Sequence, residues 1–202
     1  MQINNNVILE LILTMRIYLF ILCFVLIGSS CKKTEAPPTQ PREDGHYFSI
    51  KEFARDQWNT YHGQPFGIQK LVYMNGKSDS MYTNADGVSW GAILKMFFET
   101  DISDPKFDDK YSFSEFADPT TLTENFYYEA KDPKMFTQKL HIMADLRNHK
   151  ISSIYIETVK NNKWGSKMQR LFYEPVKSIS IQEFETMAMG KKNEVRVEYK
   201  FM

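Results

Sequence analysis

The chain has 202 residues, with 25 Lys and Arg against 25 Asp and Glu, so its formal charge at pH 7 is zero. This balance gives no electrostatic basis for binding nucleic acid. The two cysteines, Cys23 and Cys31, both precede the main body of the sequence, which excludes disulfides and thiolate metal sites there.

An apolar segment over residues 17–28 follows Arg16 and ends in the small residues at 28–30. A cationic start, an uncharged apolar centre and small residues before a cleavage point are typical of a secretory signal peptide. The segment is too short for a transmembrane helix, which needs about 20 apolar residues. Extending it backwards would bury Arg16 and Glu10 in hydrocarbon, at high cost. We therefore expect residues 1–30 to be removed.

Residues 26–31, Leu-Ile-Gly-Ser-Ser-Cys, resemble the lipobox of bacterial lipoproteins in its looser form, with serine in the last two places before the cysteine. The resemblance implies that Cys31 becomes the acylated first residue of the mature chain, modified with palmitate or a similar fatty acid. A plain secretory signal with an incidental cysteine is the alternative. Residues 1–14 are unusual ahead of such a leader, which indicates that translation starts at Met15.

Residues 31–45 are expected to form a tether. They include Pro37, Pro38 and Pro41 among polar residues and contain no large apolar side chain. Such a segment cannot bury surface and stays extended, reaching roughly 40 Å at about 3 Å per residue. The tether would hold a single domain, residues 46–202, away from a membrane.

Two helices are predicted in the first half of this domain. Ser49 and Glu52 form a capping box, after which apolar residues recur at helical spacing as far as Gly63. The pattern predicts a helix over 49–62. A second helix, over 88–100, presents large apolar residues on one side.

The rest of the domain reads as β-strands. Asn75-Gly76 between two strand-like segments is a strong hairpin signal, since both positions favour positive φ. From residue 111 onward, turn clusters separate segments of alternating polarity. We expect an α+β fold, with two helices and a β-hairpin followed by a curved antiparallel β-meander. The expected strands are 69–73, 78–83, 111–116, 124–130, 137–146, 151–160, 167–174, 178–185 and 194–201.

The hairpin around residues 147–150 is expected to pair Leu146 with Ile151. Glu157 then falls on the apolar face of the sheet. It would lie at the margin of the sheet or be a buried acid with a raised pKa, and the first is commoner. This register assigns one face to the core, through Leu140, Ile142, Ala144, Leu146, Ile151, Tyr155 and Val159.

No motif for a catalytic, metal or cofactor site stands out. The four histidines lack the close spacing of zinc ligands, and His141 alone lies on an expected strand, with Asp145 too far along its face to orient the ring. The carboxylates within residues 101–109 lack the central glycine of a calcium loop and read as a polar connection. We therefore expect no metal and no cofactor.

Trp164 is expected at a hairpin tip formed by residues 161–165. An exposed tip tryptophan can insert into a partner or a membrane interface. Large apolar side chains more often fold back over the core, and that is the expectation here.

The segments Met74-Asn75-Gly76-Lys77-Ser78-Asp79-Ser80 and Phe97-Phe98-Glu99-Thr100-Asp101-Ile102, with Trp90 between them, resemble a group of uncharacterised Bacteroidota envelope lipoproteins. The resemblance implies a lipobox, an early helix, an Asn-Gly-Lys-Ser hairpin, a Trp-bearing helix and a β-rich remainder. It implies no activity and no catalytic residues.

These observations favour a lipid-anchored envelope protein, at the outer membrane and facing the periplasm, with a non-enzymatic binding or assembly role. Trp164 and His141 are candidate residues of its binding surface, and the partner would be an envelope protein or other envelope component. One alternative is a carrier of a small apolar ligand or lipid, held in a cavity around which the meander curls. A hydrolase using His141 with a carboxylate is the other.

Replacing Cys31 with Ser is expected to abolish acylation and release the protein from membranes, because the thiol is the expected attachment atom. Metabolic labelling with a palmitate analogue and cloud-point partition of the two forms measure this. Equal labelling, or equal retention in the detergent phase, would contradict the anchor.

Overall fold

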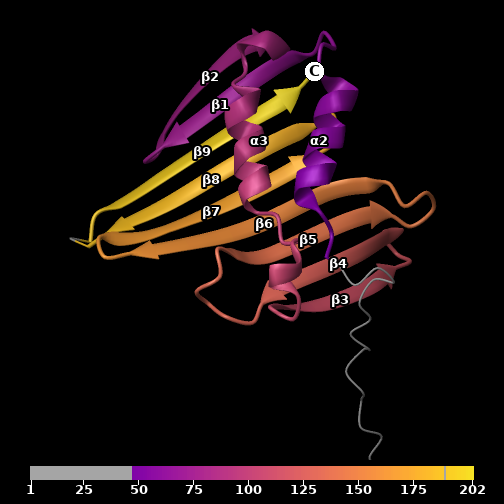
Figure 1. Cartoon of the computed structure of the whole chain (residues 1–202). Helices are drawn as coiled ribbons and strands as arrows, with labels where there is room; N and C mark the ends of the chain where they lie inside the picture. The colour runs from indigo at the N-terminus through magenta and orange to yellow at the C-terminus, as the bar shows by residue number, and fades with distance from the viewer. Residues whose placement is uncertain (1–46, 189) are drawn as a thin grey trace, which may run out of the picture. The chain divides into compact units, whose positions relative to one another are not determined.

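The computed structural model describes residues 47–188 and 190–202. The predictions for the leader, for Cys31 and for the tether lie outside the described residues. Within them, the chain forms one open β-sheet with two α-helices on one face (Figure 1). No helix in this part of the chain is long and apolar enough to cross a bilayer.

The sheet has nine antiparallel strands in the order β2-β1-β9-β8-β7-β6-β5-β4-β3. From β3 to β9 each strand pairs with the next in the chain, so the expected meander is confirmed. Strands outnumber helices, so the fold is α+β in broad terms and dominated by β-structure. β2 and β3 are the edges, and β2 is exposed along nearly its whole length. The strands are β1 (Gly67–Met74), β2 (Lys77–Asn84), β3 (Tyr111–Asp118), β4 (Thr123–Ala130), β5 (Thr137–Asp145), β6 (Ile151–Asn162), β7 (Gly165–Glu174), β8 (Ser178–Met187) and β9 (Lys192–Phe201).

Both expected helices are confirmed, as α2 (Ile50–Tyr61) and α3 (Trp90–Glu99). The Ser49 hydroxyl accepts a hydrogen bond from the Glu52 N–H at 3.2 Å, which caps α2. Gly63 follows the helix with a φ of +76°, a conformation that ends helices at little cost for glycine. Two 3-10 turns, η1 (Ala85–Gly87) and η2 (Pro105–Phe107), flank α3 in the chain.

The β1–β2 hairpin joins the meander through β9, the last strand of the chain. Asn75 and Gly76 both have positive φ, as the expected turn requires. β1 pairs with β9 and places Ile68 opposite Phe201 on the face that the helices cover. The first and the last strand of the described domain therefore lie side by side in one sheet.

The expected register of the β5–β6 hairpin is wrong. Ile151 pairs with Ala144 rather than with Leu146, and an irregularity in the pairing just after Ile151 leaves the rest of the hairpin one residue away from the expectation. Since side chains alternate along a strand, a one-residue shift exchanges the two faces of β6. Tyr155 and Val159 therefore lie on the face opposite the helices.

The observed register is the favourable one because of what it buries. Ile154 and Ile156 are fully buried beneath the helices. Glu157 is neither buried in the core nor at the sheet margin: it lies on the opposite face, where its Oε2 accepts from the Tyr155 hydroxyl at 3.1 Å and from Arg170 Nε at 3.3 Å. The expected register would have buried this carboxylate in apolar surroundings, at a cost of several kcal/mol.

Asp101 ties the start of α2 to the segment after α3. Its Oδ2 accepts from the Ser49 hydroxyl at 2.8 Å and from the Lys51 N–H at 2.6 Å, and its Oδ1 accepts from the N–H and the hydroxyl of Ser103. Burial by itself would raise the pKa of Asp101, but the bonds from Ser103, Lys51 and Ser49 outweigh it and hold the pKa below its usual value.

Asp101→Asn is expected to lower the free energy of unfolding by about 1–2 kcal/mol at pH 7, because an amide accepts these bonds more weakly and the site is partly solvated. The pKa of Asp101 is lowered on folding, so this contribution is fully present above the unfolded pKa of about 3.9 and declines as the pH falls through the folded value. Urea unfolding from pH 7 to pH 2.5 measures the difference. Asp56→Asn, on the exposed side of α2, is the matched control, and an equal loss in both variants would contradict the assignment.

Candidate functional site

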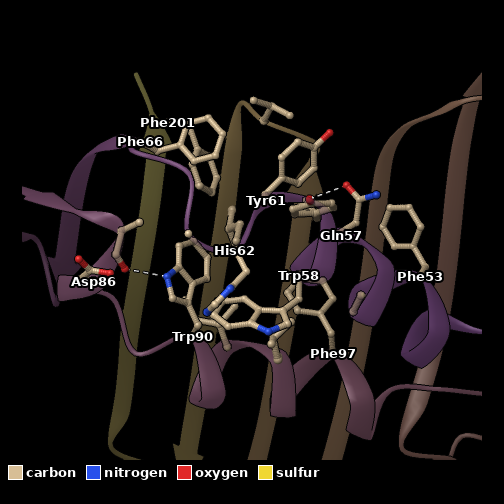
Figure 2. A pocket seen from close by; sticks show the side chains of 18 residues that line it. Phe53, Gln57, Trp58, Tyr61, His62, Phe66, Asp86, Trp90, Phe97 and Phe201 are labelled. Atoms are coloured by element: carbon tan, nitrogen blue, oxygen red, sulfur yellow. Dashed lines mark hydrogen bonds between the residues drawn. The ribbon is translucent and has the colours of Figure 1, made fainter.

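An apolar pocket of about 390 Å³ lies between the two helices and the sheet (Figure 2). Its volume is within the usual range of small-molecule sites, about 300–1,000 Å³. α2 supplies one wall, α3 and η1 supply the other, and Tyr173, Ile179 and Phe201 come from the sheet beneath them. The expected cavity inside a curled meander is absent from the described residues, since the sheet is open and the hollow lies under the helices instead.

Aromatic rings form much of the pocket wall. Trp90 stacks on Phe201 with ring centroids 5.9 Å apart and planes 14° apart, and Phe66 meets the same ring edge-on at 5.7 Å. Trp58, from α2, contacts Trp90 across the pocket at 6.1 Å. Aromatic pairs favour such offset and edge-to-face arrangements, so these contacts fix the orientation of the rings in the pocket wall.

Hydrogen bonds within the protein engage two polar groups of these walls. The Trp90 indole donates to the Ala85 carbonyl at 2.7 Å, and the Tyr173 hydroxyl donates to Gln57 Oε1 at 2.9 Å (Figure 2). Burial, with a smaller effect from Tyr61, raises the pKa of Tyr173 well above its usual value. Tyr173 is therefore neutral at physiological pH, and the pocket interior is apolar.

Val176 lines the pocket from the β7–β8 turn and has a strained backbone. Its φ is +59°, a region that β-branched residues rarely adopt. The Lys177 N–H donates to the Glu174 carbonyl at 3.1 Å and closes the turn, in which a residue with positive φ is usually Gly or Asn. Strained residues are concentrated at functional sites, so Val176 supports the choice of this pocket as the site.

His141 lies on the opposite face of the sheet, away from the pocket. Its Nε2 is 3.1 Å from Asn125 Oδ1, and its ring stacks on Tyr127 with centroids 3.9 Å apart. Burial lowers the pKa of His141, so the ring is neutral at pH 7. Asp145 instead forms a two-point contact with Arg147. Within the described part of the chain, no carboxylate contacts His141, so the pairing that a hydrolase would need is not formed.

Trp164 is 78% exposed, so the expectation that it folds back over the core is wrong. It lies at the tip of the β6–β7 hairpin, where its backbone N–H donates to Asn162 Oδ1 at 2.8 Å. The hairpin extends past the end of β5 on one side. On the other side the end of β8 reaches the tip, where the Ala188 N–H donates to the Trp164 carbonyl at 2.7 Å, yet the Trp164 side chain stays exposed. The structure does not bring Trp164 and His141 together, because His141 pairs with Tyr155, several residues before this tip.

The acidic segment after α3 makes structural contacts. Asp101 binds the start of α2, and Asp104 accepts from the Lys106 N–H and lies 2.9 Å from its ammonium group. Residues 47–188 and 190–202 contain no group of three or more potential metal ligands.

The sequence did not predict this pocket. Trp58 and Trp90 lie in the two segments of helical spacing, in which large apolar residues indicate a face packed against the core. Phe66 lies between an expected helix and an expected strand. The available signal was the number of large aromatic residues on two short helices. These residues do not by themselves predict a pocket, because a pocket depends on how far apart the helices lie on the sheet.

No protein-family model matches the chain, and neither does any curated protein or solved structure. The resemblance to envelope lipoproteins therefore stays a prediction, and function is argued from the site.

Val176→Gly is expected to stabilise the protein by about 1 kcal/mol. Relief of left-handed strain is worth about 1–2 kcal/mol, and the added chain entropy of glycine offsets about half of it. Thermal or urea unfolding measures the change. Val176→Ala keeps the Cβ and is expected to gain less, and a glycine variant less stable than the wild type would show that side-chain packing outweighs strain.

Proposed function

We propose that this chain is a lipid-anchored envelope protein, facing the periplasm, that binds a small apolar ligand without chemical conversion. The observation that carries the proposal is the pocket between α2, α3 and the sheet. It combines a volume of about 390 Å³ with aromatic walls in which the Trp90 indole and the Tyr173 hydroxyl are already hydrogen-bonded within the protein. A water-filled pocket of this kind gains free energy when apolar surface replaces the water.

The anchor and the pocket fit one role. Apolar molecules in an envelope partition into or near its membranes. A binding domain on a tether of roughly 40 Å would stay within reach of that source while remaining free to turn. The anchor thus supports capture or transfer of a ligand near the membrane surface.

A second proposal is docking of an envelope protein, and Trp164 is the observation that favours it. A tryptophan exposed by 78% at a hairpin tip is the residue type and setting of an interface anchor. Phe116, Tyr127 and His141 add a row of stacked rings on the uncovered face of the sheet. This proposal replaces the first if the pocket binds no apolar probe.

Leu94→Phe is expected to weaken ligand binding at least tenfold, because Leu94 lines the pocket and the larger ring fills it. The probe is N-phenyl-1-naphthylamine, an uncharged fluorophore that brightens in apolar sites. The full chain is measured in nanodiscs of an uncharged glycolipid, with empty nanodiscs subtracted.

Ala92→Phe is the matched control, since it adds the same ring to the exposed side of α3. Val176→Phe narrows the pocket from the opposite side and is expected to act like Leu94→Phe. The proposal fails if the wild type shows no saturable site, or if Ala92→Phe weakens binding as much as Leu94→Phe does.

A further inference from the structure

We infer that the ligand of this pocket is a hydrophobic cation, an alkylammonium or quaternary ammonium compound; this rests on the proposed function. Three features carry the inference: aromatic walls, an unpaired carboxylate, and a lining without lysine or arginine. Each concerns a different part of the pocket.

The aromatic walls suit a cation. Trp58 and Trp90 contact each other in the pocket wall, with centroids 6.1 Å apart and planes tilted by 52°, and the His62 ring lies 4.5 Å from Trp58. Tyr61 and Phe66 form a second, edge-to-face pair at 6.1 Å (Figure 2). A cation within about 6 Å of a ring centroid is attracted by the negative face of the ring, most strongly for tryptophan. Quaternary ammonium groups are recognised by such groups of rings, because they need no hydrogen bonds.

The carboxylate is Asp86 of η1, which is among the residues that line the pocket and is itself exposed to solvent (Figure 2). Within the described residues, its side chain has no hydrogen-bond donor and no ion-pair partner. The turn that presents it is held in place, because Asn84 Oδ1 accepts from the Gly87 N–H at 3.1 Å. A Cβ at Gly87 would lie 2.1 Å from the Thr83 hydroxyl oxygen, so this tight turn depends on glycine.

The lining holds no permanent positive charge. Asp86 and His62 line it, whereas none of its described residues is a lysine or an arginine. A fatty acid or a phosphate ester would therefore place a negative charge near Asp86 with only the His62 imidazole to offset it. Charge complementarity favours a ligand with a positive head and an apolar body.

Three probes with one hexyl chain and different heads test this: hexyltrimethylammonium, 1-hexanol and hexanoate. The chain has three tryptophans, so Trp164→Phe leaves Trp58 and Trp90 as reporters in the pocket. This full-length variant, in glycolipid nanodiscs with a tryptophan-free scaffold, is titrated with each probe. We expect the cation to bind about tenfold more tightly than the alcohol, and hexanoate to bind more weakly than either.

Asp86→Asn, added to this background, is expected to reduce the ratio of cation affinity to hexanol affinity about fivefold. Asp56→Asn removes the same charge from α2 outside the pocket and is expected to keep the preference. If hexanol binds as well as the cation, or Asp86→Asn keeps the preference, the inference is overturned and the proposed function stands. If no probe binds, both are overturned.

Discussion

One constraint shapes this molecule: a wide sheet has a single apolar face, and two short helices must cover it. Nine strands span about 38 Å across the sheet, whereas two helices side by side cover about 20 Å. α2 has 12 residues and α3 has 10. Because a helix rises only about 1.5 Å per residue and a strand about 3.3 Å, both helices are also shorter in length than the strands beneath them. Large rings such as Trp58 and Trp90 bridge the remaining distance, and the pocket is the space that they enclose without filling.

Local signals predicted the elements well. Ser49 marks the start of α2 and Asn75-Gly76 marks a turn, because each acts through its immediate neighbours in the chain. The register of β5 and β6 depended on an irregularity after Ile151, whose benefit is the burial of Ile154 and Ile156 under distant helices. The pairing of β1 with β9 joins segments more than a hundred residues apart. These features rest on contacts between remote segments, which periodicity does not record.

The candidate site shows the same division. The sequence predicted His141 and Trp164 as binding-surface residues from the chemistry of each side chain alone. In the structure they lie apart from each other and outside the pocket. Nothing in the sequence distinguishes Asp86 from other acidic residues, and only the fold places it in the lining of the pocket. A site that consists of a space between elements has no local motif. Its chemistry emerges only when the rings of α2, α3 and the sheet are seen on facing walls.

The openness of the sheet has a consequence beyond the pocket. Along the outer side of β2, which has eight residues, no strand of the described residues pairs with the main chain, so another polypeptide could extend the sheet there. The residues at this border alternate small, charged and polar groups, Lys-Ser-Asp-Ser, before the apolar Met81. Such a composition discourages stacking of one copy on the next. Copies of the protein could therefore lie close together without polymerising through this edge.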